Sequence, residues 1–428
     1  MLSNATPGVA CFPPHDPRGR RGIFIFQLEK LMSDPIVIVS AARTPMGSFQ
    51  GDFSSLAAHD LGGAAIKAAL ERAGLHSQFT PELVTELLFG NCLMAGQGQA
   101  PARQAGFKGG LPKSAGAVTL SKMCGSGMRA AMFAHDMLLA GSHDVLVAGG
   151  MESMTNAPYL MLKGRGGYRL GHDRIFDHMM LDGLEDAYEP GRSMGTFGED
   201  CAAKYSFTRA EQDAFATASV QRAKAATESG AFAAEITPVT VKTRAGETVV
   251  SIDEGPGKVK LDKISTLKPA FKKDGTITAA SSSSINDGAA AMVLMRESTA
   301  KKLGCTPLAR IVSHATHAQE PEWFATAPVG ATQKALAKAG WSVADVDLWE
   351  VNEAFAVVPM ALMKELNVPH DKVNVNGGAC ALGHPIGASG ARIMVTLIHA
   401  LKARGLKKGL ATLCIGGGEG TAVALELV

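Results

Sequence analysis

The residue in this sequence that is best suited to catalysis is a cysteine set among small residues. It belongs to the stretch Ser121-Lys122-Met123-Cys124-Gly125-Ser126-Gly127-Met128-Arg129-Ala130. The small and apolar residues that follow predict a mostly buried helix ending at Gly141, which places the Cys124 thiol at the helix N-terminus. Unpaired N–H groups and the helix dipole lower a cysteine pKa there, and the thiolate is the nucleophilic form. The flanking glycines leave room for a substrate, although a buried core cysteine is the competing interpretation.

Three clusters in the second half of the chain carry groups that could assist such a nucleophile. His384 lies between Gly383 and Pro385 on a rigid, accessible turn, where a general base or an oxyanion donor would be placed. Cys414 ends an apolar strand and precedes three glycines, so a thiol acid or base stands beside bare backbone N–H groups. Asn352 follows another strand-like run and can orient a water or an oxyanion, or cap a turn. A nucleotide-binding loop is disfavoured, because the glycine spacing matches neither phosphate-binding pattern.

The elements that must position these groups occur twice in the chain. The paired stretches end at Gly74 and Gly340, at Asn91 and Asn352, at Arg129 and Arg392, and at Gly150 and Gly417. Their order is the same in both halves and their separation is always roughly 265 residues, which favours a duplicated strand–helix unit over chance similarity between Ala/Gly-rich helices. A duplication predicts two pseudo-symmetric α/β halves with layers of sheet and helix. The site would form between the halves, where strand ends and helix N-termini meet.

These patterns divide the chain into three parts. Clean strand patterning begins at Asp34, so residues 1–33 are expected to be an N-terminal extension with little ordered structure, 34–299 the first half and 300–428 the second half. A polar region at about 153–273 interrupts the first half and reads as an inserted loop domain that could cover a site. The extension contains arginines and prolines and permits two interpretations, a targeting segment or an extended reading frame ahead of a natural start at Met32. We favour the second.

Composition excludes several classes of protein. The 428 residues are 46% hydrophobic and 19% charged, with 48 glycines, which is typical of a large α/β protein with many tight turns. The net charge of +2 gives no reason to expect nucleic acid or a membrane as a partner, and no apolar run approaches the length of a membrane span. Seven scattered cysteines, never spaced Cys-x-x-Cys, argue against a disulfide framework and a structural zinc site. A reducing compartment and a cytoplasmic location are expected, with mitochondrial import through the extension as the alternative.

Taken together, these clusters resemble the motifs of the thiolase family, the acetyl-CoA acetyltransferases and 3-ketoacyl-CoA thiolases. The likeness covers nearly all of residues 34–428. Besides Cys124 in its Gly-Ser-Gly setting, it rests on Val39-Ser40-Ala41-Ala42-Arg43-Thr44-Pro45, Gly149-Gly150-Met151-Glu152-Ser153-Met154, Ile285-Asn286-Asp287-Gly288-Ala289-Ala290, Asn352-Glu353-Ala354-Phe355, Gly383-His384-Pro385-Ile386-Gly387-Ala388-Ser389-Gly390 and Cys414-Ile415-Gly416-Gly417-Gly418.

The resemblance implies a duplicated α/β fold in α-β-α-β-α layers and a role for each reactive residue. Cys124 would be the acyl-accepting nucleophile, activated by His384, and Cys414 the acid/base at the α-carbon of acetyl-CoA. Asn352 would hold a water that forms one oxyanion hole with His384. The backbone N–H groups of Cys124 and Gly416 would form a second hole. Two holes are needed because charge develops on two different thioester oxygens in the two half-reactions.

The resemblance also implies the substrates and the assembly. Acetyl-CoA, acyl-CoA and coenzyme A would be substrates of a reversible Claisen condensation and thiolysis, with no cofactor and no metal. The positions expected to bind substrate and coenzyme A are Met194, Ser283, Ala354 and Phe355. The loop 163–169 resembles the segment through which family members form tetramers, so a homotetramer built as a dimer of dimers is expected. Acetoacetyl-CoA chemistry is favoured over a broader-chain degradative thiolase of fatty-acid β-oxidation.

Two departures from the family pattern and three alternatives accompany this interpretation. Ser193 stands where many biosynthetic members carry His, and Glu419 where Met is common, so chain-length preference stays open. A decarboxylating ketoacyl synthase would pair its cysteine with two histidines, but Cys414 occupies one of those places. A non-catalytic thiolase-like lipid-binding protein would lack Cys124, His384 or Cys414. A redox protein would need Cys124 and Cys414 as a stable disulfide in its working state.

Overall fold

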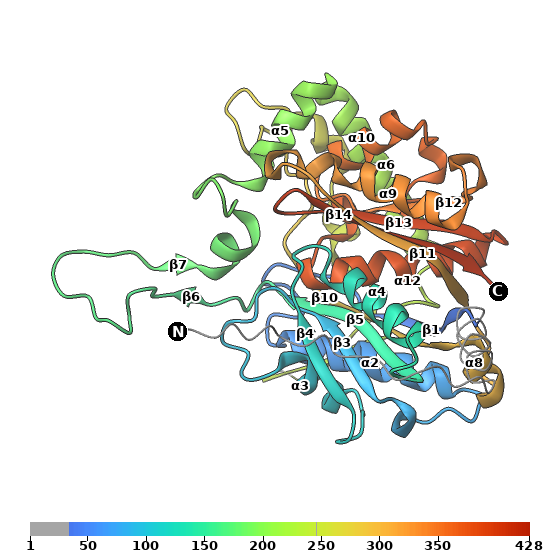
Figure 1. Ribbon diagram of the computed structural model, residues 1–428. Helices are drawn as coiled ribbons and strands as arrows, with labels where there is room; N and C mark the ends of the chain where they lie inside the picture. The colour runs from blue at the N-terminus through green and yellow to red at the C-terminus, as the bar shows by residue number, and fades with distance from the viewer. Residues whose placement is uncertain (1–33, 245) are drawn as a thin grey trace, which may run out of the picture.

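Two halves of the chain, each built on its own set of strands, share one ten-stranded sheet in the computed structural model (Figure 1). The structure describes residues 34–244 and 246–428, so the expected N-terminal extension lies outside the described residues. Figure 1 shows the strands β1, β3, β4 and β5 of the first half, in blue and teal, below the orange and red strands of the second half, while the green helices α5 and α6 lie at the top beside the second half. Among the described residues, the two sets of strands join through a short antiparallel contact, in which Val37 and Ile38 pair with Arg310 and Ala309.

The first half has the strand order β4-β3-β5-β10-β1. Its strands are β1 (Ile36–Arg43), β3 (Glu86–Gly90), β4 (Gly116–Leu120), β5 (Val145–Ser153) and β10 (Asn286–Arg296), with β2 (Gly47–Ser48) paired to β10. Strands β4, β3 and β5 are parallel, whereas β10 runs antiparallel to both β5 and β1. The helices of this half are α2 (Ala58–Gly74), α3 (Pro101–Lys108), α4 (Ser126–Leu139) and α8 (Glu297–Leu303).

The second half repeats the same arrangement with the order β12-β13-β14-β11. Its strands are β11 (Ala309–Ala318), β12 (Leu348–Val351), β13 (Lys408–Ile415) and β14 (Glu419–Leu427), and its helices are α9 (Ala327–Ala339), α10 (Val357–Leu366), α11 (Ala379–Leu382) and α12 (Ile386–Arg404). Strand β12 is parallel to β13, and β14 is antiparallel to β13 and β11. The antiparallel pairs β1–β10 and β11–β14 each carry a bulge at the equivalent position, after Ile38 and after Ile311.

Hydrogen bonds of equivalent serines confirm the predicted duplication. The Ser40 hydroxyl, just after the first bulge, donates to the Ala69 carbonyl of α2 at 2.6 Å. The Ser313 hydroxyl, just after the second bulge, donates to the Ala335 carbonyl of α9 at 2.7 Å. The same short polar contact therefore fixes the first helix of each half against its sheet.

The core has layers, as the duplication predicts. One apolar cluster lies between α2, α3 and the first set of strands. A second cluster joins both sets of strands to α4 and α12, which form the central helical layer, and a third lies beneath α9 and α10. Helices α4 and α12 touch at glycines, because a Cβ on Gly127 would lie 2.8 Å from the Ala391 backbone nitrogen and one on Gly390 would lie 2.6 Å from the Met128 backbone nitrogen.

The long connection from β5 to β10 is the main difference between the halves. Where the second half turns from β13 into β14 through Gly416-Gly417-Gly418, the first half inserts residues 154–285. This segment contains β6 (Tyr159–Leu160), β7 (Phe176–Asp177), the π-helical turn Met180–Leu184, α5 (Met194–Tyr205), α6 (Arg209–Glu228), β8 (Val239–Thr243), β9 (Gly246–Val250) and α7 (Glu254–Lys258). Helix α6 begins at a capping box, in which the Thr208 hydroxyl accepts from the Glu211 amide and the Glu211 carboxylate accepts from the Thr208 amide.

No helix in the described part of the chain is long and apolar enough to cross a membrane.

Candidate active site

The predicted site residues from both halves meet at one largely apolar pocket. Seven of the nine line it directly, namely Cys124, Met194, Ser283, Ala354, Phe355, His384 and Gly416. The remaining two, Asn352 and Cys414, are fully buried. The inserted segment adds Gly183 and Leu184 to the lining, so it covers part of this site.

The loop before α4 holds the Cys124 thiol in place by hydrogen bonds of a neighbouring serine. The Ser126 hydroxyl accepts from the Lys122 backbone amide at 2.8 Å and donates to the Met123 carbonyl at 2.7 Å. Met123 has a φ of 45°, a left-handed conformation that is costly for a residue with a side chain. The strained turn presents Cys124 immediately before the N-cap residue Gly125, where the sequence places it.

Burial, rather than the helix dipole, sets the protonation of Cys124. Desolvation raises its pKa to about 11, although hydrogen bonds from the backbone amides of Gly416 and Cys124 itself act in the opposite direction. The lowered pKa expected from the helix N-terminus is therefore wrong for the free site, because protein atoms exclude the water that would solvate a thiolate. The resting group is a thiol, and it must lose its proton during the reaction.

His384 is positioned by the turn before α12 and has one ring nitrogen available. Gly383 has a φ of 97° and a Cβ there would lie 2.0 Å from the Asn286 side chain, so only glycine fits before the histidine. The His384 amide donates to the Ser284 carbonyl at 3.2 Å. Its Nε2 atom is buried and has no hydrogen-bond partner among the described residues.

Ser389 determines which nitrogen of His384 carries the proton. The Ser389 hydroxyl lies 2.5 Å from His384 Nδ1 and donates its only hydrogen to the Pro385 carbonyl at 2.8 Å. The hydroxyl must then accept from Nδ1–H, which leaves Nε2 as a bare acceptor facing the pocket. Burial, with a contribution from the Arg392 charge, lowers the pKa of His384 to about 3, so the ring is neutral.

Asn352 directly follows β12, and its side chain makes no hydrogen bond to the described residues. Its Oδ1 and Nδ2 atoms are both buried and both lack a hydrogen-bond partner among the described residues. Unsatisfied buried amides are costly, and they persist at sites where a ligand or a water supplies the missing bonds. The side chain is thus suited to a polar ligand rather than to capping a turn.

A buried carboxylate braces the histidine segment from the first half. Glu152, at the end of β5, accepts from the Gly387 amide of α12 at 2.8 Å and from the Cys92 amide at 3.0 Å. It also accepts from the Asn91 side chain at 2.6 Å and from the Leu93 amide at 3.1 Å. Burial raises the pKa of Glu152, but these four donors all favour its ionised form. The carboxylate therefore connects the first half to the start of the helix that follows His384.

Cys414 is the last but one residue of β13 and lies within electrostatic reach of Cys124. Burial, with a contribution from the Cys124 charge, raises the pKa of Cys414 well above its usual value. A thiol of raised pKa is a weak acid, and its thiolate is correspondingly a strong base. The site therefore combines one partly accessible thiol and one neutral imidazole nitrogen at the pocket with one fully buried thiol outside the pocket lining.

The glycines around Cys124 have a packing role that the sequence did not reveal. A Cβ on Gly125 would lie 2.4 Å from Cδ1 of Ile415, and one on Gly150 would lie 2.0 Å from the Gly387 carbonyl oxygen. These glycines let the two halves approach each other, whereas the expectation was that they clear space for substrate. Close approach brings the β13 end, with Gly416, onto the Cys124 loop.

Several residues of the site were not predicted. Phe324, Leu184 and Ile386 line the pocket with apolar side chains. The positive charge of Arg392 contributes to the lowered pKa of His384. No motif marks Phe324 or Leu184, since each lies in a helical turn too short to show a period. The two residues that depart from the family pattern both have structural contacts. The Ser193 side chain is the N-cap of α5 and accepts from the Gly195 amide. Glu419 forms an ion pair with Lys122 of the other half.

Comparison with known proteins agrees with this geometry. The family model described as "Thiolase, N-terminal domain" matches residues 36–298, and "Thiolase, C-terminal domain" matches residues 305–427. The chain is 52% identical over 392 residues to an acetyl-CoA acetyltransferase of Escherichia coli, covering 91% of this chain and 98% of that protein. It is 51% identical over 393 residues to one of Chromobacterium violaceum, covering 91% and 99%. The crystal structure of the Bacillus anthracis acetyl-CoA acetyltransferase superposes with a TM-score of 0.89 at 41% identity, covering 92% and 99%.

Proposed function

The chain belongs to the thiolase family, and on that premise we propose that it is an acetyl-CoA acetyltransferase that makes or cleaves acetoacetyl-CoA through an acyl-Cys124 intermediate. The observation that carries the proposal is the pocket itself. It brings the Cys124 thiol, the Gly416 amide and the bare His384 Nε2 together from two halves of the chain. About half of all residues are shared with several acetyl-CoA acetyltransferases over most of the chain, which supports the same activity here.

The first half-reaction transfers an acyl group to Cys124. Nε2 of His384 takes the thiol proton as sulfur attacks the thioester carbon of an acyl-CoA, since burial of the thiol and of the imidazole opposes a separated ion pair beforehand. The backbone amides of Cys124 and Gly416 hold the oxyanion of the tetrahedral species. The carbon–sulfur bond to coenzyme A then breaks and the leaving thiolate takes the proton of the Cys414 thiol. Acyl-Cys124, protonated His384 and the Cys414 thiolate remain.

The second half-reaction forms or breaks the carbon–carbon bond. The Cys414 thiolate removes a proton from the α-carbon of a second acetyl-CoA, and the resulting enolate attacks the acetyl carbonyl on Cys124. The enolate oxygen accepts from Nε2–H of the protonated His384 and from a water bound to Asn352, whose polar side-chain atoms have no partner among the described residues. Collapse of the tetrahedral species releases acetoacetyl-CoA and the Cys124 thiolate, which takes back the proton held by His384, while Cys414 is again a thiol. Thiolysis is the same sequence in reverse, and coenzyme A is a substrate of a reaction that uses no cofactor or metal.

Substitution of the nucleophile tests the proposal directly. Cys124→Ser should lower thiolysis of acetoacetyl-CoA by at least about 10⁴-fold and abolish the trapping of a labelled acetyl group, because the alkoxide is far harder to form than the thiolate. Cys305→Ser, a buried cysteine remote from the pocket, is the matched control and should retain activity. Normal turnover by folded Cys124→Ser would contradict the mechanism.

A series of 3-ketoacyl-CoA substrates separates the proposed activity from its alternative. A broader-chain degradative thiolase would process long chains with kcat/KM similar to that for acetoacetyl-CoA. We expect kcat/KM to fall as the chain lengthens, because Phe324, Leu184 and Ile386 crowd the pocket that holds the acyl group. A flat chain-length profile would replace the proposed activity with the alternative.

We also propose a homotetramer, built as a dimer of dimers through the arm that carries residues 163–169. The arm extends away from the body between β6 and β7 (Figure 1). It exposes a run of apolar side chains, namely Tyr159, Met161, Leu162, Leu170 and Ile175, at 60% to 99% of their surface. Exposed apolar patches of this kind mark interaction sites. In light scattering, Leu170→Glu should convert tetramers to dimers, whereas Ile252→Glu, an equally apolar exposed position outside the arm, should not.

A cytoplasmic location is part of the proposal. All six cysteines of the described part of the chain are free thiols, which supports a reducing compartment. Fractionation of the native host should recover the activity with cytoplasmic markers, and recovery in an organelle would favour the targeting interpretation of the N-terminal residues.

A further inference from the structure

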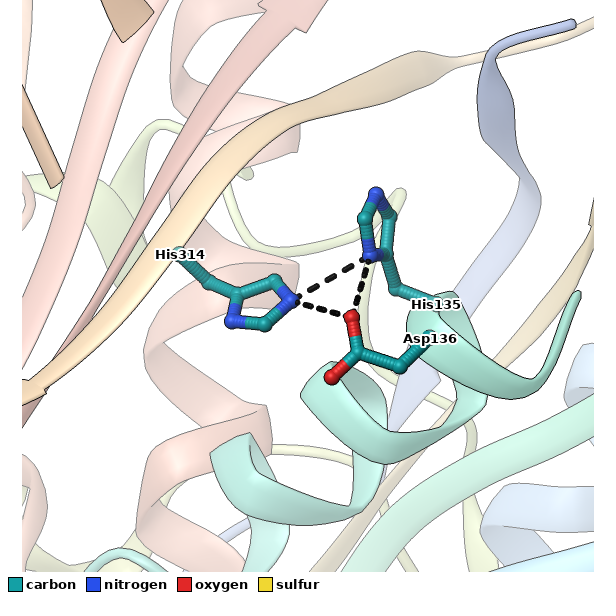
Figure 2. Close-up of side chains that lie close together, drawn as sticks. All are labelled: His135, Asp136 and His314. Carbon is teal, nitrogen blue, oxygen red and sulfur yellow. Dashed lines mark hydrogen bonds and ion pairs between the residues drawn. The ribbon is translucent and has the colours of Figure 1, made fainter. Parts of the chain in front are cut away.

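Three metal-ligating side chains converge at a place that the proposed reaction does not use. His135 and Asp136 lie near the C-terminal end of α4, and His314 lies on β11 of the other half (Figure 2). His314 Nε2 lies 2.8 Å from Asp136 Oδ1 and 3.2 Å from His135 Nδ1, and His135 Nδ1 lies 3.1 Å from the same carboxylate oxygen. Figure 2 shows the three atoms as the corners of a small triangle.

The dimensions of this triangle match one face of a metal coordination shell. Ligand atoms at about 2.0–2.1 Å from a tetrahedral ion are about 3.3 Å from each other. The three observed separations lie between 2.8 and 3.2 Å, so a shift of a few tenths of an ångström would admit an ion. The two rings meet edge to face, with centroids 4.9 Å apart and planes at 88°, which lets both nitrogens aim at one point without stacking.

The chemistry and the exposure of the three groups are also those of ligands. Each imidazole binds an ion in its neutral form, with its hydrogen on the ring nitrogen that faces away from the ion, and the carboxylate binds in its ionised form. The side chains of His135 and His314 are about seven-eighths covered, whereas that of Asp136 is 52% exposed, which leaves an entry path and a fourth position for water.

We propose that His135, Asp136 and His314 bind one divalent transition-metal ion of the zinc class. Two imidazole nitrogens and one carboxylate suit Zn²⁺, Co²⁺, Ni²⁺ or Cu²⁺, whereas Mg²⁺ and Ca²⁺ require six or more oxygens. The charges of Arg129 and Lys338 act on His314 and weaken the site, so its affinity is below that of a closed four-ligand structural site. The metal would connect α4, which begins two residues after Cys124, to the sheet of the other half.

The metal site is separate from the reaction and does not depend on the proposed function. Its physical consequence is linkage, since an ion that binds only the folded protein stabilises it. Because the ligands come from both halves, the bound ion opposes their separation.

Cobalt is the probe for the test. Full-length protein carrying Cys124→Ser, which removes the accessible thiol as a competing ligand, is stripped with a chelator and titrated with Co²⁺. We expect about one equivalent of tetrahedral Co²⁺ with visible d–d absorption and no thiolate charge-transfer band. His314→Ala should weaken Co²⁺ binding at least tenfold, and Asp136→Asn, which keeps the shape of the side chain, should do the same.

A histidine on the same strand provides the matched control. His317, three residues along β11, contacts Gln319 and Lys334 instead of the cluster, and His317→Ala should leave Co²⁺ binding unchanged. Added Zn²⁺ should raise the Tm of the parent protein and of His317→Ala, but not that of Asp136→Asn. Circular dichroism of the metal-free variants confirms that each is folded. Absence of Co²⁺ binding up to millimolar concentration would overturn the proposal, as would equal affinity in the parent, His314→Ala and Asp136→Asn proteins.

Discussion

The asparagines that follow β3 and β12 occupy equivalent places in two halves of the same topology, yet the hydrogen bonding of their side-chain nitrogens differs. Asn91 Nδ2 donates to Glu152 at 2.6 Å and takes part in the brace beneath α12. Both polar atoms of Asn352 lack a partner among the described residues, although the residue is as completely buried. In the first half this position contributes a hydrogen bond to stability, whereas in the second half the side chain can bind a ligand or a water.

The acidic residues that follow the β5 and β13 glycines differ in the same way. Glu152 is buried and accepts four hydrogen bonds. Glu419 is partly exposed and forms one ion pair, with Lys122. The duplication therefore supplied one scaffold, and the hydrogen-bond partners present at each position differ between its two copies.

The largest effect expected from this comparison concerns the two cysteines, one from each half. Cys414→Ala should lower condensation by about 10³–10⁴-fold, because it removes the base at the α-carbon. The variant should still take a labelled acetyl group onto Cys124, because the thiolate of coenzyme A is a stable leaving group and can take its proton from water instead of from Cys414. Rapid exchange of the acetyl α-protons in this variant, measured by NMR, would break the assignment.

The paired asparagines provide the next contrast. Asn352→Ala should lower kcat by about 10²-fold, the usual cost of losing one oxyanion-stabilising group, with little change in stability. Asn91→Ala should instead lower the free energy of unfolding by about 1–3 kcal/mol, because it leaves the buried Glu152 carboxylate short of a donor. Steady-state kinetics of both variants give the loss in kcat, and urea denaturation gives the loss in the free energy of unfolding. Similar kinetic losses in the two would show that the equivalent positions are not divided in this way.

Glutamine substitutions at the two acidic residues sharpen the comparison further. Glu152→Gln places an NH₂ group against backbone donors and should lower the free energy of unfolding by about 2–3 kcal/mol. Glu419→Gln should cost less than about 1 kcal/mol, because its ion pair with Lys122 is partly solvated. The measurement is the urea midpoint with an unchanged m-value. An equal loss in both variants would mean that the Glu419 pair is as important as the buried brace.

The pH dependence of stability should reflect one residue from each half, His384 of the second half at acidic pH and Cys124 of the first half at alkaline pH. His384 has a lowered pKa, so the unfolded state binds more protons between about pH 3 and 6.5 and stability falls as the solution is acidified, by at most about 1.4 kcal/mol per pH unit. Cys124 has a raised pKa, so the unfolded thiol ionises first and stability falls as pH rises above about 9. His384→Gln should reduce the slope of the acidic limb alone and Cys124→Ser that of the alkaline limb alone, while other buried histidines and cysteines account for the slope that remains. Identical pH profiles for wild type and both variants would refute these shifts.

Much of the site could be predicted from the sequence because its motifs are local. Cys124, His384, Cys414 and Asn352 each stand at a strand end or a helix start, and periodicity locates those ends. The duplication was equally visible, since matched stretches recur in order along the chain. Phe324 and Leu184 could not be found this way, because each lies in a helical turn too short to show a period, Leu184 in the inserted segment and Phe324 between β11 and α9.

The reactive residue types, their order and the pairing of two halves follow from the amino-acid sequence. Their state follows from how the halves pack: Cys124 rests as a thiol, Ser389 leaves Nε2 of His384 bare, and the glycines allow contact between the halves. The packing also places His135 and Asp136 beside His314, far apart in the chain. The physical reason is the same in each case. Desolvation and contact depend on which groups cover one another, and that is fixed when the halves pack.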